Sequence, residues 1–442
     1  MERTQGKLIR QYIGIGSLAF TAVLYIVSGV AFLVWKSEIP QIVKFVIFGY
    51  SMVMGITGIL GCFSNFSFSK LLRGAMPIAF GFIFLAFINQ FSTLYALFLG
   101  IYILIIAIVK TIDYSIKCSN KTPGRIMELL SAIVIYLFAL PLLFAPGINI
   151  RRAFLITGLF CIFYGLSLLG DFIVEIAPIK QTNRFKKRVR VNLPVFMTML
   201  MPKKAISYVN KLLAVDEDGI IEEDSFKVDT TPGIEIFVHV TEKGFGTIGH
   251  ADIWFEGSIY CYGNYDFQSS KLFGTIGDGV LFTTNDRDEY IKFCAKETGD
   301  SIFAFGLNIN ESQKEAIRKR LNELFTHIYP WESLYQKMEQ GEIKLDEVPT
   351  DYASNLYKAT HAKMYKFKDT SFKTYFVLTT NCVKLSDYVI RATGIAAANP
   401  NGIMSPGAYY DYFNQQYRLK NSIVISKQTY HHNATIEHEK AL

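Results

Sequence analysis

The sequence lacks the motifs that mark several common classes of protein. It has no Walker loop, and no glycine triad follows a strand into a helix, so no phosphate- or dinucleotide-binding loop is predicted. Its six cysteines form no CxxC pair and no Cys/His spacing typical of a metal site. No module of interleaved basic and aromatic residues favours nucleic-acid binding. We therefore expect no cofactor, no metal ion and no nucleic-acid partner.

Charged residues are scarce as well. They make up 19% of the 442 residues, whereas hydrophobic residues make up 50%, which is too apolar for an ordinary soluble protein. The apolar residues concentrate in the first 175 positions. We expect a transmembrane helical domain over residues 1–175, followed by a soluble part long enough to form its own core.

Six apolar runs occupy the first part, and a membrane-spanning helix needs about 20 apolar residues. The runs cover approximately residues 13–35, 41–62, 74–88, 93–109, 128–145 and 153–174. The third and fourth are separated only by Asn89-Gln90-Phe91-Ser92. We expect a tight hairpin there, because Asn and Gln are costly in mid-membrane without partners; one long helix is the alternative. Charged residues lie at the ends of the runs, so a membrane anchor is favoured over a transporter.

The distribution of Lys and Arg predicts the orientation. These residues are more frequent on the N-terminal side of the bilayer, which with six spans places both ends of the chain in the cytoplasm. Residues 176–212 form a basic linker with a short apolar stretch. It either lies at the membrane interface or is a solvated flank of the last span. Beyond it we expect an α+β domain over residues 213–427 and a disordered tail over 428–442.

The most informative stretch of the soluble part joins a strand-like run, residues 374–378, to a predicted helix. Thr380 or Asn381 is a suitable N-cap, which places Cys382 in the first helical turn. A thiol there feels the positive end of the helix dipole, which favours the thiolate, and free N–H groups of that turn can hold an oxyanion. A buried structural cysteine is the alternative.

Histidines upstream provide candidate bases for this thiol. His250 follows a glycine-rich loop and begins a predicted strand, and a second strand follows at once. His239, on the strand before, is the rival base. A third residue should orient the imidazole through its other nitrogen, and Asp252 lies on the same strand face as His250.

This order, with His250 first and Asn381-Cys382 opening a later helix, resembles the circularly permuted papain-like (NlpC-type) cysteine hydrolases and acyltransferases, which include lecithin:retinol acyltransferase. The resemblance covers about residues 233–412 and implies an α+β fold with an antiparallel sheet. It implies Cys382 as nucleophile, His250 as base and, about a dozen positions after the histidine, Tyr262 or Asn264 as the third residue. Tyrosine is unusual in that role. The helical domain resembles small bacterial HdeD-type membrane proteins.

Together these features predict a membrane-anchored cysteine hydrolase or acyltransferase that cleaves an amide or ester through a thioester. Its partners would be membrane lipids and a peptide or acyl substrate, and its oligomeric state is open. The alternative is a catalytically inactive, membrane-tethered binding or sensor module.

Overall fold

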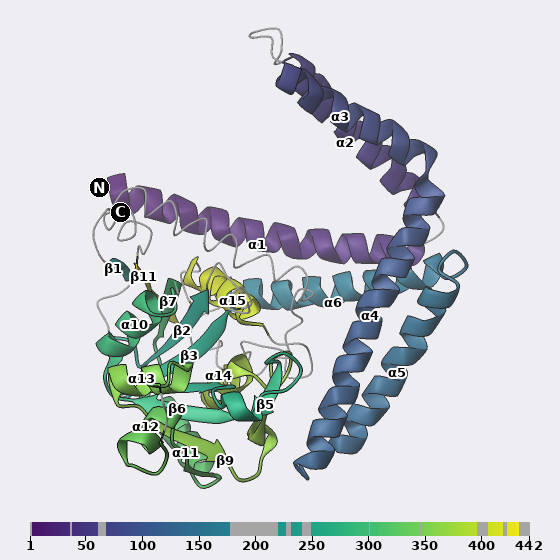
Figure 1. Cartoon of the computed structure of the whole chain (residues 1–442). Coiled ribbons are helices and arrows are strands. Elements are labelled where there is room, and N and C mark those ends of the chain that lie inside the picture. The colour runs from purple at the N-terminus through teal and green to yellow at the C-terminus, as the bar shows by residue number, and fades with distance from the viewer. Residues whose placement is uncertain are drawn as a thin grey trace. The chain divides into compact units, whose positions relative to one another are not determined.

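The computed structural model describes residues 2–35, 38–60, 68–176, 220–226, 231–240, 249–299, 301–344, 347–395, 405–418 and 422–432. It contains an N-terminal helical part and a C-terminal antiparallel sheet part (Figure 1). The predicted linker and the end of the predicted tail, from residue 433 onward, lie outside the described residues.

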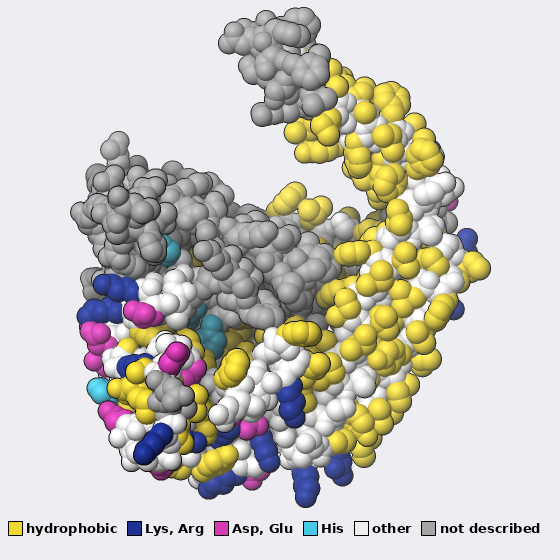
Figure 2. All heavy atoms as spheres, in the orientation of Figure 1, with side chains coloured by type: hydrophobic (Ala, Val, Ile, Leu, Met, Phe, Trp, Pro, Cys, Tyr) yellow, Lys and Arg dark blue, Asp and Glu magenta, His cyan; other side chains and the backbone are white. Residues whose placement is uncertain are grey.

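The helical part consists of α1 (Glu2–Val34), α2 (Ile39–Leu60), α3 (Phe68–Ala86), α4 (Ile88–Ser119), α5 (Arg125–Phe144) and α6 (Ile150–Ile176). In the described part of the chain, four stretches are long and apolar enough to cross a membrane: Pro40–Thr57, Ile88–Ser119, Arg125–Phe144 and Ile150–Gly170. Two shorter apolar helical stretches are Ala19–Val34 and Ala75–Ala86. Hydrophobic side chains dominate the surface of these helices, whereas most charged side chains gather on the sheet part (Figure 2). The chain is therefore a membrane protein, with six spans expected and four supported.

The junction between α3 and α4 differs from the expected hairpin. A single bent residue, Phe87, separates the two helices, and helical hydrogen bonds continue on both sides of it, from Phe87 N to Ile83 O and from Phe91 N to Phe87 O. Asn89 lies inside α4 and not in a turn. A one-residue break is too short for an antiparallel hairpin, so the hairpin prediction is wrong. The expected turn relied on the cost of placing Asn89 and Gln90 in the membrane. The helix-forming residues around them outweigh that cost.

Small residues let α1 and α6 approach closely. A Cβ atom added at Gly29 would lie 2.7 Å from the Gly158 carbonyl oxygen, and one added at Gly165 would lie 2.9 Å from the Ala22 carbonyl oxygen. In a bilayer there is little hydrophobic drive to pair helices, so such close backbone contact provides the attraction.

The sheet part is built on a nine-stranded antiparallel sheet with strand order β1-β11-β7-β2-β3-β4-β6-β9-β8. The strands are β1 (Ile220–Phe226), β2 (Ile234–Val240), β3 (His250–Phe255), β4 (Ser258–Gly263), β6 (Val280–Thr284), β7 (Ser301–Leu307), β8 (Ile328–Pro330), β9 (Lys363–Phe367) and β11 (Val424–His432). A small second sheet pairs β5 (Ile276–Asp278) with β10 (Thr374–Phe376). The predicted strand that begins at His250, the strand before it and the strand that follows at once are confirmed as β3, β2 and β4.

Helices cover both faces of the large sheet. Buried residues of α11 (Glu311–Phe325), α14 (Cys382–Ile390) and α15 (Pro406–Arg418) pack with one face. Residues of α10 (Arg287–Lys296) and α13 (Tyr352–Thr360) pack with the other. Strand alternation divides the side chains: Ile236 and Val238 enter the first core, and Phe237 between them enters the second. Because these strands are buried on both faces, their sequences are nearly continuous apolar runs.

The last strand corrects the predicted tail. Residues 428–432, expected to be disordered, form the end of β11, which pairs with β1 on one side and β7 on the other. Their polar side chains have partners from elsewhere in the fold: Arg287 donates hydrogen bonds to Gln428 and Tyr430, and His431 Nδ1 lies 2.8 Å from Ser301 Oγ. Polar composition suggested disorder because these partners are distant in sequence.

Candidate functional site

His250 begins β3, and the residue before it explains the position. Gly249 has φ of +89°, a conformation that side chains disfavour. A Cβ atom there would lie 2.7 Å from the His239 carbonyl oxygen. Glycine thus lets the chain turn into β3 beside β2, where His250 is paired with His239. At the strand end the His250 side chain keeps 24% of its surface exposed, so it can meet a substrate.

Asp252 is the principal partner of His250. Two residues along β3, it points to the same side of the sheet and is completely buried. Asp252 Oδ1 lies 2.8 Å from His250 Nε2, and Oδ2 lies 2.8 Å from His239 Nε2. The Tyr290 hydroxyl from α10 donates a hydrogen bond to Oδ2. One carboxylate therefore lies within ion-pair distance of two imidazoles and accepts a hydrogen bond from a phenol.

Opposing effects set the charges of this pair. Burial lowers the pKa of His250, but the charges of Asp252, Cys382 and Cys261 together raise it more, and the net pKa lies well above its usual range. Burial raises the pKa of Asp252, but the two histidines lower it more, so its net pKa lies well below its usual range. The pair is therefore an imidazolium–carboxylate ion pair over a wide range of pH.

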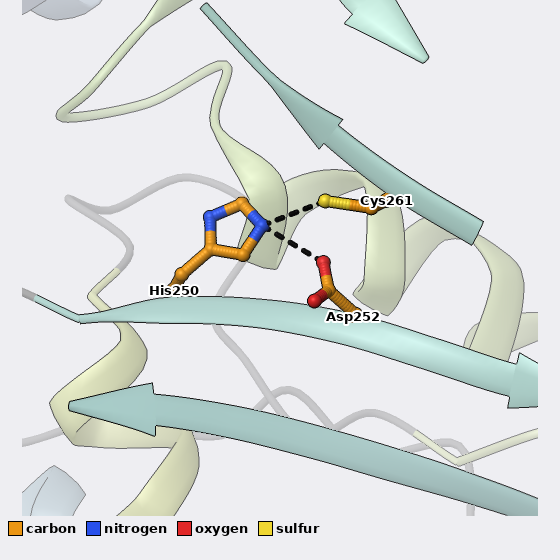
Figure 3. Close-up of side chains that lie close together, drawn as sticks. All are labelled: His250, Asp252 and Cys261. Atoms are coloured by element: carbon orange, nitrogen blue, oxygen red, sulfur yellow. Dashed lines mark hydrogen bonds and ion pairs between the residues drawn. The ribbon is translucent and has the colours of Figure 1, made fainter. Parts of the chain in front are cut away.

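A thiol and a phenol complete the polar contacts on this side of the ring. Cys261 Sγ on β4 lies 2.9 Å from His250 Nε2 and 2.9 Å from the Tyr265 hydroxyl, which itself lies 3.2 Å from Nε2 (Figure 3). Burial and the Asp252 charge raise the pKa of Cys261 well above its usual range. Cys261 is thus held as a neutral, inaccessible thiol behind the histidine.

Cys382 is the first residue of α14, and Asn381 is the N-cap. The Asn381 side chain accepts a hydrogen bond from Lys384 N at 3.2 Å and donates one to Val377 O at 2.7 Å. Ser386 Oγ donates to Ala251 O at 3.4 Å, which joins α14 to β3 next to His250. Asn381 therefore acts as the helix cap, and one of its two side-chain N–H donors is engaged by Val377.

The charge of Cys382 acts on the His250 ring. The Cys382 charge raises the pKa of His250 at least as much as that of Cys261, whose sulfur touches the ring. After burial, Cys382 and His250 are also the two strongest influences on the pKa of Tyr375, in opposite directions. Such effects fall off with distance, and Ser386 on α14 bonds Ala251 beside His250, so Cys382 lies within electrostatic reach of the ring. Cys382 itself is 2% exposed.

The two nitrogens of His250 are therefore not equivalent. Nε2 faces Asp252 and Cys261, while Nδ1 is turned away from both (Figure 3). Among the residues that the structure describes, Nδ1 has no hydrogen-bond partner. An imidazole anchored through one nitrogen presents the other for proton transfer.

The two residues expected to orient His250 lie elsewhere. Tyr262 is fully buried, and its hydroxyl donates to the Phe372 carbonyl oxygen at 2.9 Å. Asn264 Nδ2 bonds Ser270 Oγ and the Gly274 carbonyl oxygen. Neither contacts the imidazole in the described structure. Tyr262 follows Cys261 in an extended strand, so it points to the opposite side of the sheet from the residue that meets His250.

Sequence reasoning gave Asp252 only as an alternative and missed Cys261, Tyr265 and Tyr290. The spacing of His250 and Asp252 on one strand face was the available signal for the carboxylate. The rival base, His239, is buried as the second partner of that carboxylate. Cys261 and Tyr290 reach the site through strand pairing and helix packing, which no local pattern reports.

His250, Asp252 and Cys261 also offer three metal-ligand atoms within 4.8 Å of one another. These residue types bind zinc, but ligand atoms about 2.0–2.3 Å from a tetrahedral ion lie about 3.3–3.8 Å apart. Here Nε2 is 2.8 Å from Asp252 Oδ1 and 2.9 Å from Cys261 Sγ. The side chains would have to separate to admit an ion, so the geometry fits a closed polar cluster better than a metal centre.

Comparison of the chain with protein-family models, with curated proteins and with solved structures finds no match in any of the three. The likeness to papain-like hydrolases therefore stays a prediction, and the case for function comes from the geometry around His250.

Proposed function

We propose that the protein is a membrane-anchored thiol hydrolase or acyltransferase of permuted papain-like type. Cys382 is the nucleophile, His250 the base and Asp252 the residue that orients His250. One observation carries this proposal. The His250 ring is anchored through Nε2 by a buried carboxylate, while the thiol at the start of α14 lies within electrostatic reach.

In this mechanism Nδ1 of His250 holds the proton of Cys382 in a thiolate–imidazolium pair, and the thiolate sulfur attacks a substrate carbonyl carbon. A C–S bond forms, the C–N or C–O bond of the substrate breaks, and His250 gives the proton to the leaving group. Water or an acyl acceptor then attacks the thioester, giving its proton to His250; the C–S bond breaks and the thiolate–imidazolium pair is regenerated. Asp252 stabilises the imidazolium form of His250.

The start of α14 supplies donors for the oxyanion. Lys384 N bonds the Asn381 side chain and Leu385 N bonds the Asn381 carbonyl oxygen. Among the described residues, the N–H groups of Cys382 and Val383 have no such partner. Two backbone donors beside the attacking sulfur fit the developing charge of a tetrahedral intermediate.

The test is competitive alkylation of the full-length protein, with mass-spectrometric readout at each cysteine and with His250→Ala as the comparison. We expect Cys382 to react faster than Cys294, a buried cysteine one turn after Tyr290 on α10, and to slow by about ten-fold or more in His250→Ala. Removing the imidazole opens the site, so greater access alone would give the opposite change.

Cys261→Ser is the matched control, because it removes the other thiol near His250 and should leave Cys382 labelling fast. Labelling of Cys382 that is no faster than Cys294 and indifferent to His250 would contradict the proposal. The inactive, membrane-tethered binding module would then be the better description.

A further inference from the structure

Three large hydrophobic side chains project from one hairpin of the sheet part. Phe267 is 82% exposed, Leu272 is 62% exposed and Phe273 is 95% exposed. Among the described residues from 220 to 432 these are the most exposed large hydrophobics, and we call them the apolar tip. They lie between β4 and β5, in and after the short helix η2 (Phe267–Ser269). Such exposure in one small loop marks an interaction site.

The backbone of the tip is strained. Leu272 and Phe273 have φ of +48° and +57°, followed by Gly274 at +86°. Hydrogen bonds from Gly274 N to Lys271 O and from Thr275 N to Leu272 O close consecutive left-handed turns. Asn and Gly suit these positions, whereas Leu and Phe are disfavoured there. The fold therefore does not require the two bulky residues, and their presence needs another reason.

The base of the hairpin holds the tip in place. Lys271 pairs with Ile276 through two backbone hydrogen bonds. Asn264 Nδ2 bonds the Gly274 carbonyl oxygen, and Val377 N bonds the Thr275 carbonyl oxygen. These hydrogen bonds fix the base of the hairpin and therefore the position of the apolar tip.

We propose that the apolar tip inserts into the headgroup–acyl boundary of an anionic bilayer. The chain carries its own candidate spans, so a bilayer is tethered to the sheet part through residues 177–219. Tethering raises the effective concentration of the surface, so a small insertion suffices. The exposed Lys271, within the hairpin, and Lys373, just before β10, supply positive charge for anionic headgroups.

Insertion at this point has a consequence for substrate choice that depends on the proposed function. β5 follows the tip and pairs with β10, and the chain after β10 leads directly to Cys382. The tip therefore belongs to the same supporting structure as the nucleophile. Bilayer-borne acyl esters or lipid-modified chains are then the substrates of Cys382, in preference to soluble peptides.

The test uses full-length protein in vesicles of phosphatidylcholine and phosphatidylglycerol, with Trp35→Phe as a common background to remove the tryptophan of the helical part. Phe273→Trp is the probe. Tyr329→Trp, an exposed position on β8, is the matched control. We expect phosphatidylcholine brominated near the carbonyl end of its chains to quench the emission added at position 273, and acrylamide to quench the emission added at position 329.

Lipid quenching at position 273 should weaken when phosphatidylglycerol is omitted. Equal lipid quenching at the two positions, or acrylamide quenching at position 273 as strong as at 329, would overturn the proposal. Emission at 273 that is shielded from both quenchers would also overturn it, because the tip would then be covered by protein. None of these outcomes depends on activity. Insertion can therefore fail while Cys382 proves reactive, and Cys382 can prove unreactive while the tip inserts.

A second variant separates insertion from folding. Leu272→Asn with Phe273→Gly places turn-forming residues where the left-handed backbone suits them. We expect the sheet part to unfold at a higher temperature than in the wild type. On the proposed function, turnover of an acyl ester presented in vesicles should fall while turnover of a short soluble ester is kept. A lower unfolding temperature would mean that the two side chains serve the fold.

Discussion

Asp252 lies at the centre of the polar cluster, and its charge must be balanced inside an apolar layer. Removing one member of a buried ion pair leaves the other uncompensated, at a cost of about 3–5 kcal/mol. The exposed pair of His327 and Asp369 has the same chemistry at the surface, where such pairs contribute less than about 1 kcal/mol. The two pairs offer a comparison within one chain.

We predict that Asp252→Asn lowers the free energy of unfolding by several times the effect of Asp369→Asn. The raised pKa of His250 means that its ion pair stabilises the wild type fully below the unfolded-state value, about 6.5, and that this contribution is lost as pH rises through the higher folded-state value. Without the Asp252 charge, burial is less strongly opposed, so the pKa of His250 should fall below its value in the wild type.

Histidine NMR titration of the two variants, beside chemical unfolding as a function of pH, checks this prediction. Stability of the wild type should decline at alkaline pH more than that of Asp252→Asn. An unchanged His250 titration in Asp252→Asn would show that the carboxylate does not control the imidazole.

At the scale of elements, α14 depends on its cap. Asn381 accepts from Lys384 N and donates to Val377 O, which links the helix start to the chain after β10. We predict that Asn381→Ala destabilises the sheet part by about 1 kcal/mol and slows alkylation of Cys382, because the first turn loses its orientation. Asn381→Asp keeps the acceptor and should lose less.

Thermal unfolding and alkylation rates measured on the same preparations test the cap. If Asn381→Ala left both unchanged, the helix start would be held by packing alone, and the position of Cys382 would not depend on the cap.

The elements divide into those that local pattern predicts and those that it does not. At the start of α11, Asn310 and Gln313 form a reciprocal capping box, which their spacing in the sequence favours. The α3–α4 junction and the end of β11 were predicted wrongly. Polar residues suggested a turn at the junction, but helical hydrogen bonds continue across it. Polar residues also suggested disorder at the end of β11, but strand partners distant in sequence hold it.

For the whole molecule, the Lys/Arg distribution predicts that both ends of the chain face the cytoplasm, provided that α3 and α4 cross the membrane separately despite the short break at Phe87. We expect a fluorescent protein fused after Leu442 to fluoresce in a bacterial host and a secreted phosphatase fused at the same point to be inactive. A fusion after Phe144, at the end of α5, should behave in the opposite way.

An active phosphatase after Leu442 would mean an odd number of crossings. The nearly continuous helix across Phe87 would then be one span, and the sheet part would face away from the cytoplasm. Cell-wall peptides, which a cytoplasmic domain cannot reach, would become the favoured substrates.

The sequence by itself determined the apolar helices, the strands β2, β3 and β4 around His250, and the placement of Cys382 at a capped helix start. These features depend on residues within a few positions of one another. Only the tertiary structure decided that Asp252, and not Tyr262 or Asn264, anchors His250, and that His239, Cys261 and Tyr290 surround it. Strand register and helix packing choose among partners far apart in the chain, and a one-residue change of register moves a side chain to the other face of the sheet.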